Sequence, residues 1–208
     1  MPRRWFIAGV ATAALAGIAI GIAFHRQLNG SAAAGPLALP ALHGQATWPA
    51  SQRAAPAITL RDQHGRRVTL ASLRGRTIAL AFLDSRCKQA CPIEGRLLGA
   101  AIRRVSGAAR PQLVVVSVDP AGDTPPSVTQ ALAKWRLPAS TIWLLGTHAA
   151  LKPVWDGYQI TVDPASGDIV HSTAVYLIDR RGYERAGFLM PFVPGLVADD
   201  LRILGVET

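Results

Sequence analysis

Four short apolar runs lie between residues 77 and 178 of the chain. They cover residues 77–83, 112–118, 141–145 and 172–178. Runs of this length without polar alternation are typical of strands that are covered on both faces. Between the first two runs, residues 93–105 place apolar side chains at the spacing of one helical face, which predicts an amphipathic helix. A second helix is predicted from Thr124 as N-cap, with Pro125 at the first helical position, and a less regular third over 149–155.

Two hairpins and a last helix complete the predicted domain. Apolar residues 58–60 and 68–70 flank a turn over 62–65, where glycine tolerates positive φ. A second hairpin turns at 179–182 and precedes a helix over 196–204. Strands that alternate with helices, followed by a terminal hairpin, predict an α/β sandwich with a mixed central sheet.

A longer apolar run opens the chain, from Trp5 to Phe24. As a helix it would rise about 30 Å, which matches the hydrocarbon core of a bilayer. Arg3 and Arg4 precede it, so the positive-inside rule predicts a cytoplasmic N terminus and an extracytoplasmic remainder. We therefore predict a membrane anchor over residues 1–26. A signal peptide cut near residues 32–34 is the alternative.

Composition divides the rest of the chain into a linker and a folded domain. Residues 27–55 are rich in Gly, Ala, Pro and Ser without periodicity, which predicts a flexible linker before a domain over 56–208.

The net charge of the 208 residues is +9. The arginines are scattered and no nucleic-acid motif accompanies them, so we expect no nucleic-acid partner. A mildly basic surface of this kind favours binding to acidic proteins or to anionic lipid headgroups.

The two cysteines of the chain, Cys87 and Cys91, lie between the first long strand and the first long helix. Pro92 suits the first helical position, which would place Cys91 at the N-cap, where backbone N–H groups stabilise a thiolate. Arg86 and Lys88 add positive charge, so at least one thiol should ionise more readily than a free cysteine. A structural disulfide is the alternative, but it would close a very small loop. Two thiolates and a histidine suit Cu(I), whereas structural zinc needs four ligands.

Other polar and aromatic residues have ordinary structural interpretations. Asp119 and Asp123 are expected to accept local backbone hydrogen bonds at a turn and a helix entry. Surface positions are expected for His25, His43, His64 and His148, and core positions for Trp135, Trp143 and Trp155.

Three motifs in the folded domain carry a family resemblance. They are Cys87-Lys88-Gln89-Ala90-Cys91-Pro92, then 116–120 with 123–125, and then His171-Ser172 leading into 175–179. Together, over residues 56–206, they resemble the SCO/SenC family of thioredoxin-like copper chaperones for respiratory oxidase assembly. The resemblance implies a thioredoxin-like (peroxiredoxin-like) α/β fold.

The resemblance also implies a site and a partner. Copper would be held by Cys87, Cys91 and His171, as Cu(I) and, with some tightening, as Cu(II). It would be passed to the dinuclear copper site of cytochrome c oxidase subunit II or to another exported copper or thiol protein. His171 should then sit on the loop that enters a central strand. From the pattern alone, a solvent-exposed loop histidine is an equal alternative.

Two further functions stay open at this point. One is a thiol–disulfide oxidoreductase in which Cys87 and Cys91 act as the redox pair on cysteines of an exported partner. Lys88 favours it, because lysine promotes a thiolate without being a metal ligand. The other, a peroxiredoxin-like peroxidase, is supported by the fold alone.

Overall fold

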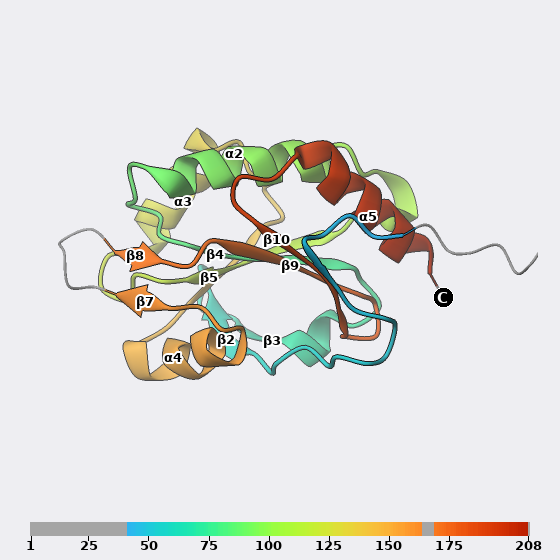
Figure 1. Cartoon of the computed structure of the whole chain (residues 1–208). Helices are drawn as coiled ribbons and strands as arrows, with labels where there is room; N and C mark the ends of the chain where they lie inside the picture. Colours follow the sequence, from blue (N-terminus) through green and yellow to red (C-terminus); the bar gives the residue numbers. More distant parts are fainter. Residues whose placement is uncertain (1–40, 164–168, 208) are drawn as a thin grey trace, which may run out of the picture. The chain divides into compact units, whose positions relative to one another are not determined.

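A mixed sheet of eight strands runs through the centre of the computed structural model, which describes residues 41–163 and 169–207 (Figure 1). In spatial order the strands are β1 (Ala46–Thr47), β10 (Glu184–Leu189), β9 (Ala174–Ile178), β4 (Ile78–Leu83), β5 (Gln112–Ser117), β6 (Ile142–Leu145), β2 (Thr59–Asp62) and β3 (Arg67–Thr69).

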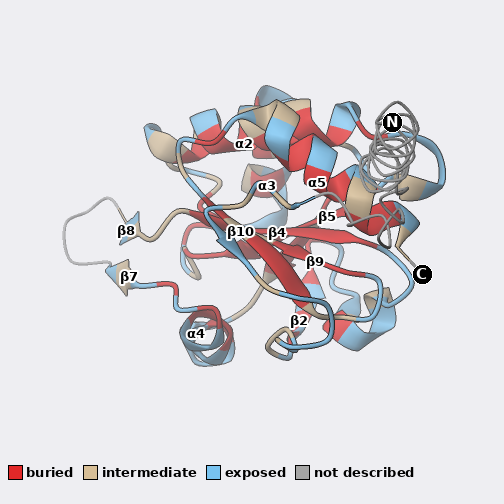
Figure 2. Cartoon of the chain, turned by 45° about the vertical axis from the view of Figure 1, so that its right-hand side comes forward, coloured by how far each residue is buried: buried red, intermediate tan, exposed pale blue. Residues whose placement is uncertain are grey.

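The four apolar runs form the middle of this sheet, as predicted. Strands β4, β5 and β6 are parallel, and β9 is antiparallel to β4. Every residue of β4 and β5 is buried, because helices cover both faces of the sheet (Figure 2). Alternate residues enter opposite cores: Ala81 packs in one and Phe82 in the other. The predicted mixed sheet is confirmed.

Helices cover the two faces unequally (Figure 1). One core combines residues of the sheet with α2 (Ala90–Arg103), α3 (Pro125–Lys134) and α5 (Pro194–Val206), and the other combines them with α4 (His148–Gly157) and the 3₁₀ turn η1 (Leu70–Leu73). The predicted Thr124 cap is confirmed, since its hydroxyl accepts a hydrogen bond from the Ser127 backbone N–H. A second 3₁₀ turn, η2 (Gly107–Ala109), precedes β5.

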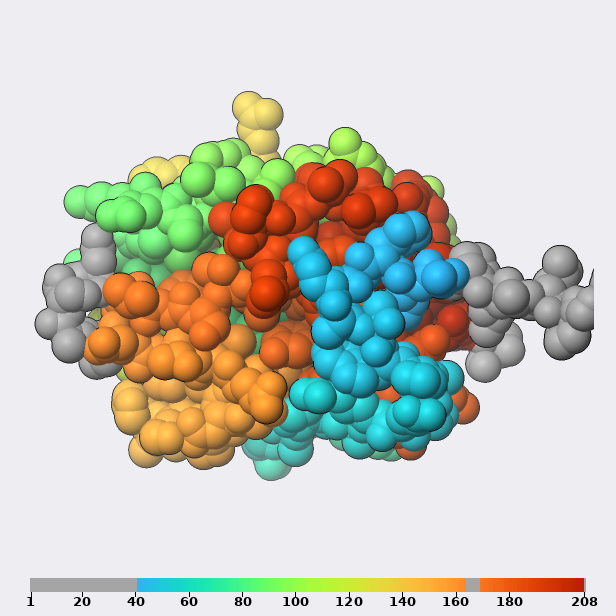
Figure 3. All heavy atoms as spheres, viewed as in Figure 1, coloured from blue at the N-terminus to red at the C-terminus, as the bar shows by residue number. Residues whose placement is uncertain are grey.

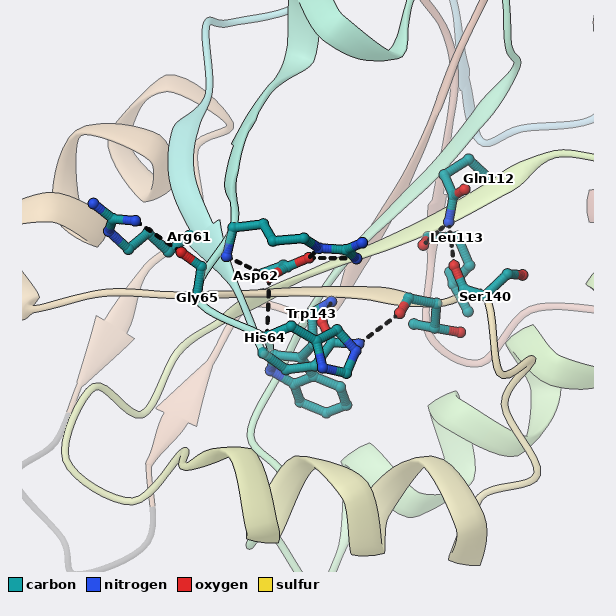
Figure 4. Close-up of polar contacts among 11 residues, drawn as sticks. Arg61, Asp62, His64, Gly65, Gln112, Leu113, Ser140 and Trp143 are labelled. Atoms are coloured by element: carbon teal, nitrogen blue, oxygen red, sulfur yellow. Dashed lines mark hydrogen bonds and ion pairs between the residues drawn. The ribbon is translucent and has the colours of Figure 1, made fainter.

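The first predicted hairpin is confirmed as β2 and β3, and its turn is held by polar contacts (Figure 4). The Asp62 carboxylate accepts hydrogen bonds from the backbone N–H groups of His64 and Arg66, each at 2.9 Å. Arg61 donates to the Gly65 carbonyl at 2.7 Å, and Gly65 has a φ of +78°. Glycine adopts this left-handed conformation without steric cost.

Part of the predicted linker belongs to the folded unit. Strand β1 pairs with β10, and the buried Asp200 carboxylate accepts hydrogen bonds from both the backbone N–H and Nδ1 of His43, the latter at 2.7 Å. In the space-filling view the first described residues (blue) lie against the C-terminal segments (red) (Figure 3). The folded unit therefore extends to residues before the expected starting point near Pro56. His43 lies at the surface, as predicted, and it is paired with Asp200. A two-residue strand and one side-chain contact leave no periodic signal in a sequence.

The predicted anchor over residues 1–26 lies outside the described residues, as does the linker up to residue 40. Within residues 41–163 and 169–207, no helix combines the length and the apolar character that a bilayer crossing requires.

Candidate metal and thiol site

The loop between β4 and α2 carries Cys87 and is fixed by carboxylates. Asp123 accepts hydrogen bonds from the Ser85 backbone N–H at 2.8 Å and from the Trp143 indole N–H at 3.3 Å. The Asp84 carboxylate accepts from the Arg86 backbone N–H at 2.7 Å. Burial raises the pKa of Asp123 to about 6. Asp123 is structural, as predicted, but it joins distant segments instead of making only local bonds.

Helix α2 starts earlier than the sequence predicted. Its first residue is Ala90 and its N-cap is Gln89, so Cys91 is the second helical residue and not the cap. Pro92 is consequently the third helical residue. Proline is tolerated there because the first turn of a helix has no intrahelical acceptor for its N–H groups.

Cys91 and His171 come together although 80 residues separate them in the chain. The Cys91 Sγ lies 3.5 Å from the His171 Nε2, and the His171 Nδ1 lies 2.9 Å from the Ser172 carbonyl oxygen. A carbonyl can only accept, so Nδ1 carries a proton, and the tautomer with a single proton has a lone pair on Nε2 facing the sulfur. A histidine that ligates a metal usually has such an outer partner.

The position of His171 differs in detail from the expectation. It belongs to the short strand β8 (Val170–His171), which pairs with β7 (Val162–Asp163) outside the main sheet and precedes β9. The side chain is half-buried. The alternative of a fully solvent-exposed loop histidine therefore does not apply.

The two thiols differ in burial and in acidity. Cys87 is half-buried, whereas Cys91 is fully buried. A hydrogen bond from the Cys91 thiol, assisted by the backbone N–H groups of Cys91 and Gln89, lowers the pKa of Cys87 to about 5. The same interaction, together with burial, raises the pKa of Cys91. One thiol ionises readily, as predicted, but it is Cys87 and not the helix-start Cys91.

Glu94 is a polar residue of this region that the sequence reasoning missed. It is fully buried, and neither carboxylate oxygen has a hydrogen-bond partner among the described residues. Burial, and then the nearby Cys87 thiolate, raise the pKa of Glu94 to about 8. Its signal in the sequence was a glutamate on the same helical face as the buried Cys91 and Leu98.

A pocket of about 250 Å³ lies between the Cys87 thiol and the His171 imidazole; its lining also includes Asp84 and Thr173. The 3.5 Å between the Cys91 Sγ and the His171 Nε2 would let one metal ion bind both atoms, since bonds from zinc to sulfur and nitrogen are about 2.3 and 2.0 Å long. Across residues 41–163 and 169–207, no three His, Cys, Asp or Glu side chains already form a metal cage. A centre that includes Cys87 therefore needs local side-chain movement. Two sulfurs and a neutral imidazole fit Cu(I).

This combination of features, a thioredoxin-like sandwich with a cysteine pair at a helix start and a histidine beside it, defines a class of thiol- or metal-binding domains. The SCO1/SenC family model matches residues 48–201. The chain belongs to this family.

Individual relatives agree with that assignment. Protein sco1 of Schizosaccharomyces pombe is 27% identical over 136 residues, which are 61% of this chain and 51% of the relative, so the chain spans about half the length of that protein. The structure of Arabidopsis thaliana ScoI with copper bound has a TM-score of 0.65 at 24% identity, covering 70% of this chain and 94% of the other. Bradyrhizobium japonicum ScoI with copper bound has a TM-score of 0.61 at 25% identity, covering 73% and 99%.

Proposed function

We propose that this chain is a copper chaperone that holds Cu(I) through Cys87, Cys91 and His171. It would deliver the metal to the copper site of cytochrome c oxidase subunit II or to another exported copper or thiol protein. The observation that carries the proposal is the 3.5 Å approach of the His171 Nε2 to the Cys91 Sγ in a member of this family. Two related structures with copper bound support the choice of metal.

Each of the three side chains would have a separate task. Cys87 offers a thiolate at neutral pH because its pKa is lowered to about 5. Cys91 must release its proton when the metal arrives, so loading should release protons and weaken at low pH. His171 supplies a neutral nitrogen whose orientation is fixed by the Ser172 carbonyl. Cu(II) would use the same donors.

A competitive titration tests the proposal. The reduced full-length protein is titrated with Cu(I) against a chelator of known affinity, and one equivalent should bind. Loss of an outer partner of a ligand costs about 10- to 100-fold in metal affinity, so His171→Ala should cost at least about 100-fold. His64→Ala, an exposed turn histidine, is the matched control. Equal affinity of parent and His171→Ala would remove His171 from the ligand set.

A second function is favoured by the inequality of the two thiols. In a thiol–disulfide exchange, the Cys87 thiolate would attack a disulfide of an exported partner and release one partner thiolate. Cys91, after losing its proton, would attack the Cys87 sulfur and release the second thiolate, so that two electrons pass to the partner. The half-buried Cys87 and fully buried Cys91 suit the attacking and resolving roles. His171→Ala should leave this exchange largely intact. A parent that reduces disulfides without binding Cu(I) would make this the better function.

The proposal places the domain outside the cytoplasm, tethered by the apolar run of residues 5–24. Arg3 and Arg4 support this orientation. A reporter enzyme that works only in the cytoplasm, fused to the C terminus, should be inactive. An active reporter would contradict the proposed compartment.

A further inference from the structure

A second pocket, of about 500 Å³, shares Cys87 with the copper-site pocket and is otherwise lined by different residues. Its cationic lining comes from three elements: the cysteine loop, α2 and α3. We call this pocket the basic groove and define it by Arg86, Lys88, Arg96 and Lys134 around Cys87.

The charge of the basic groove is one-sided. No Asp or Glu side chain is among its described lining residues. Within the described part of the chain, none of its four cations forms an ion pair, whereas cations elsewhere do, such as Arg53 with Glu184 and Arg66 with Asp62. A concave surface lined by one sign of charge concentrates ligands of the opposite sign.

Apolar side chains accompany these cations in the lining of the basic groove. Pro92, Ala131 and Trp135 contribute to the lining, and only 3% of Trp135 is exposed. Trp135 packs so closely on α2 that a Cβ added at Gly95 would lie 2.7 Å from its ring. Trp135 is therefore held in place by α2, and the polar side chains of Ser127 and Gln130 also line the pocket. A pocket that combines apolar side chains with positive charge suits a short peptide.

We propose that the basic groove binds an acidic segment of the partner protein, next to the partner cysteine that meets Cys87. We infer an acidic segment because its charge complements the cations of the groove. We infer a cysteine-bearing polypeptide and not a lipid headgroup because the groove shares Cys87 with the copper-site pocket. The inference rests on the proposed function only in that the partner reacts at Cys87. Binding of the segment itself requires neither copper nor exchange.

Two pairs of synthetic peptides separate binding from chemistry. The first pair contains a central serine flanked by either glutamates or glutamines, and titration calorimetry with the reduced full-length protein measures affinity. We expect about 10-fold tighter binding of the glutamate peptide at low salt, with the advantage falling as salt shortens the Debye length from about 10 Å to about 3 Å. Equal affinity of the two peptides would overturn the proposal, whatever the outcome for copper or exchange.

The second pair carries a cysteine as a mixed disulfide with thiopyridine. Cys87 attacks the peptide sulfur, forms a peptide disulfide and releases thiopyridone, whose absorbance gives the rate. The glutamate peptide should react about 10-fold faster than the glutamine peptide. A lack of reaction with either peptide would refute the exchange function, and the calorimetry would still decide the groove.

Double substitutions test whether the preference for the glutamate peptides arises in the basic groove. In Arg96→Gln/Lys134→Gln the ratio between glutamate and glutamine peptides should fall close to one. The control Arg67→Gln/Lys152→Gln removes the same charge from exposed positions outside the groove and should keep the parental ratio. A fall in the control as large as in the groove variant would show that only net charge matters. Tighter binding of soluble dihexanoyl phosphatidylserine than of the glutamate peptide would assign the groove to lipid. Either of these two results would overturn the proposal.

Discussion

Glu94→Gln should change how the stability of this protein depends on pH. Glu94 is fully buried without a hydrogen-bond partner among the described residues, and its pKa is raised from 4.5 to about 8, first by burial. Between these two values the folded protein keeps a proton that the unfolded chain has lost. Stability therefore falls as pH rises through this window, and glutamine, which does not ionise, removes that contribution.

The magnitude follows from proton linkage. One proton corresponds to a slope of about 1.4 kcal/mol per pH unit, so Glu94 lowers the free energy of unfolding by about 3 kcal/mol between pH 5 and pH 7. Cys87 acts in the opposite direction, because its pKa is lowered from 9.0 to about 5 and the unfolded chain binds the extra proton. In the parent these two contributions nearly cancel. In Glu94→Gln the Cys87 contribution stays, so the slope of stability against pH should exceed that of the parent by about 1.4 kcal/mol per pH unit.

Urea unfolding of the reduced parent and variant, at several values between about pH 5 and pH 7, measures both slopes. Asp156→Asn, which removes an exposed carboxylate of α4, is the control and should follow the parent. Parallel curves for parent and Glu94→Gln would refute the reasoning, because they would mean that Glu94 gains no proton on folding.

Two further predictions concern the thiols and the packing of α2. Iodoacetamide should modify Cys87 of the reduced protein and spare the buried Cys91, with a rate midpoint near pH 5; a midpoint near that of a free cysteine would contradict the thiolate assignment. Gly95→Ala would bring a Cβ to 2.7 Å from the Trp135 ring and should cost about 1–3 kcal/mol in thermal unfolding, whereas Gly195→Ala meets nothing within 4 Å and should not destabilise. Equal melting temperatures for the two variants would argue against a rigid Trp135.

Much of the fold was predictable from the chain alone because its signals are local. Runs of apolar residues mark β4, β5, β6 and β9, and the Thr124-Pro125 pair marks the start of α3. The family resemblance, and not periodicity, predicted that His171 lies close to the cysteines. The observed contact with Cys91 agrees with that expectation, and the role of the three residues as copper ligands stays a prediction.

The tertiary structure alone decided the pKa values of the site residues and the contacts between residues that are distant in the chain. The start of α2 at Ala90 buries Cys91 and leaves Cys87 as the thiolate, and the packing of that helix buries Glu94 without a partner. The His43 contact with Asp200 spans 157 positions, and the basic groove draws its cations from three separate elements. The amino-acid sequence determines periodicity along each segment, whereas a pKa or an ion pair depends on distances and burial between segments that only folding brings together.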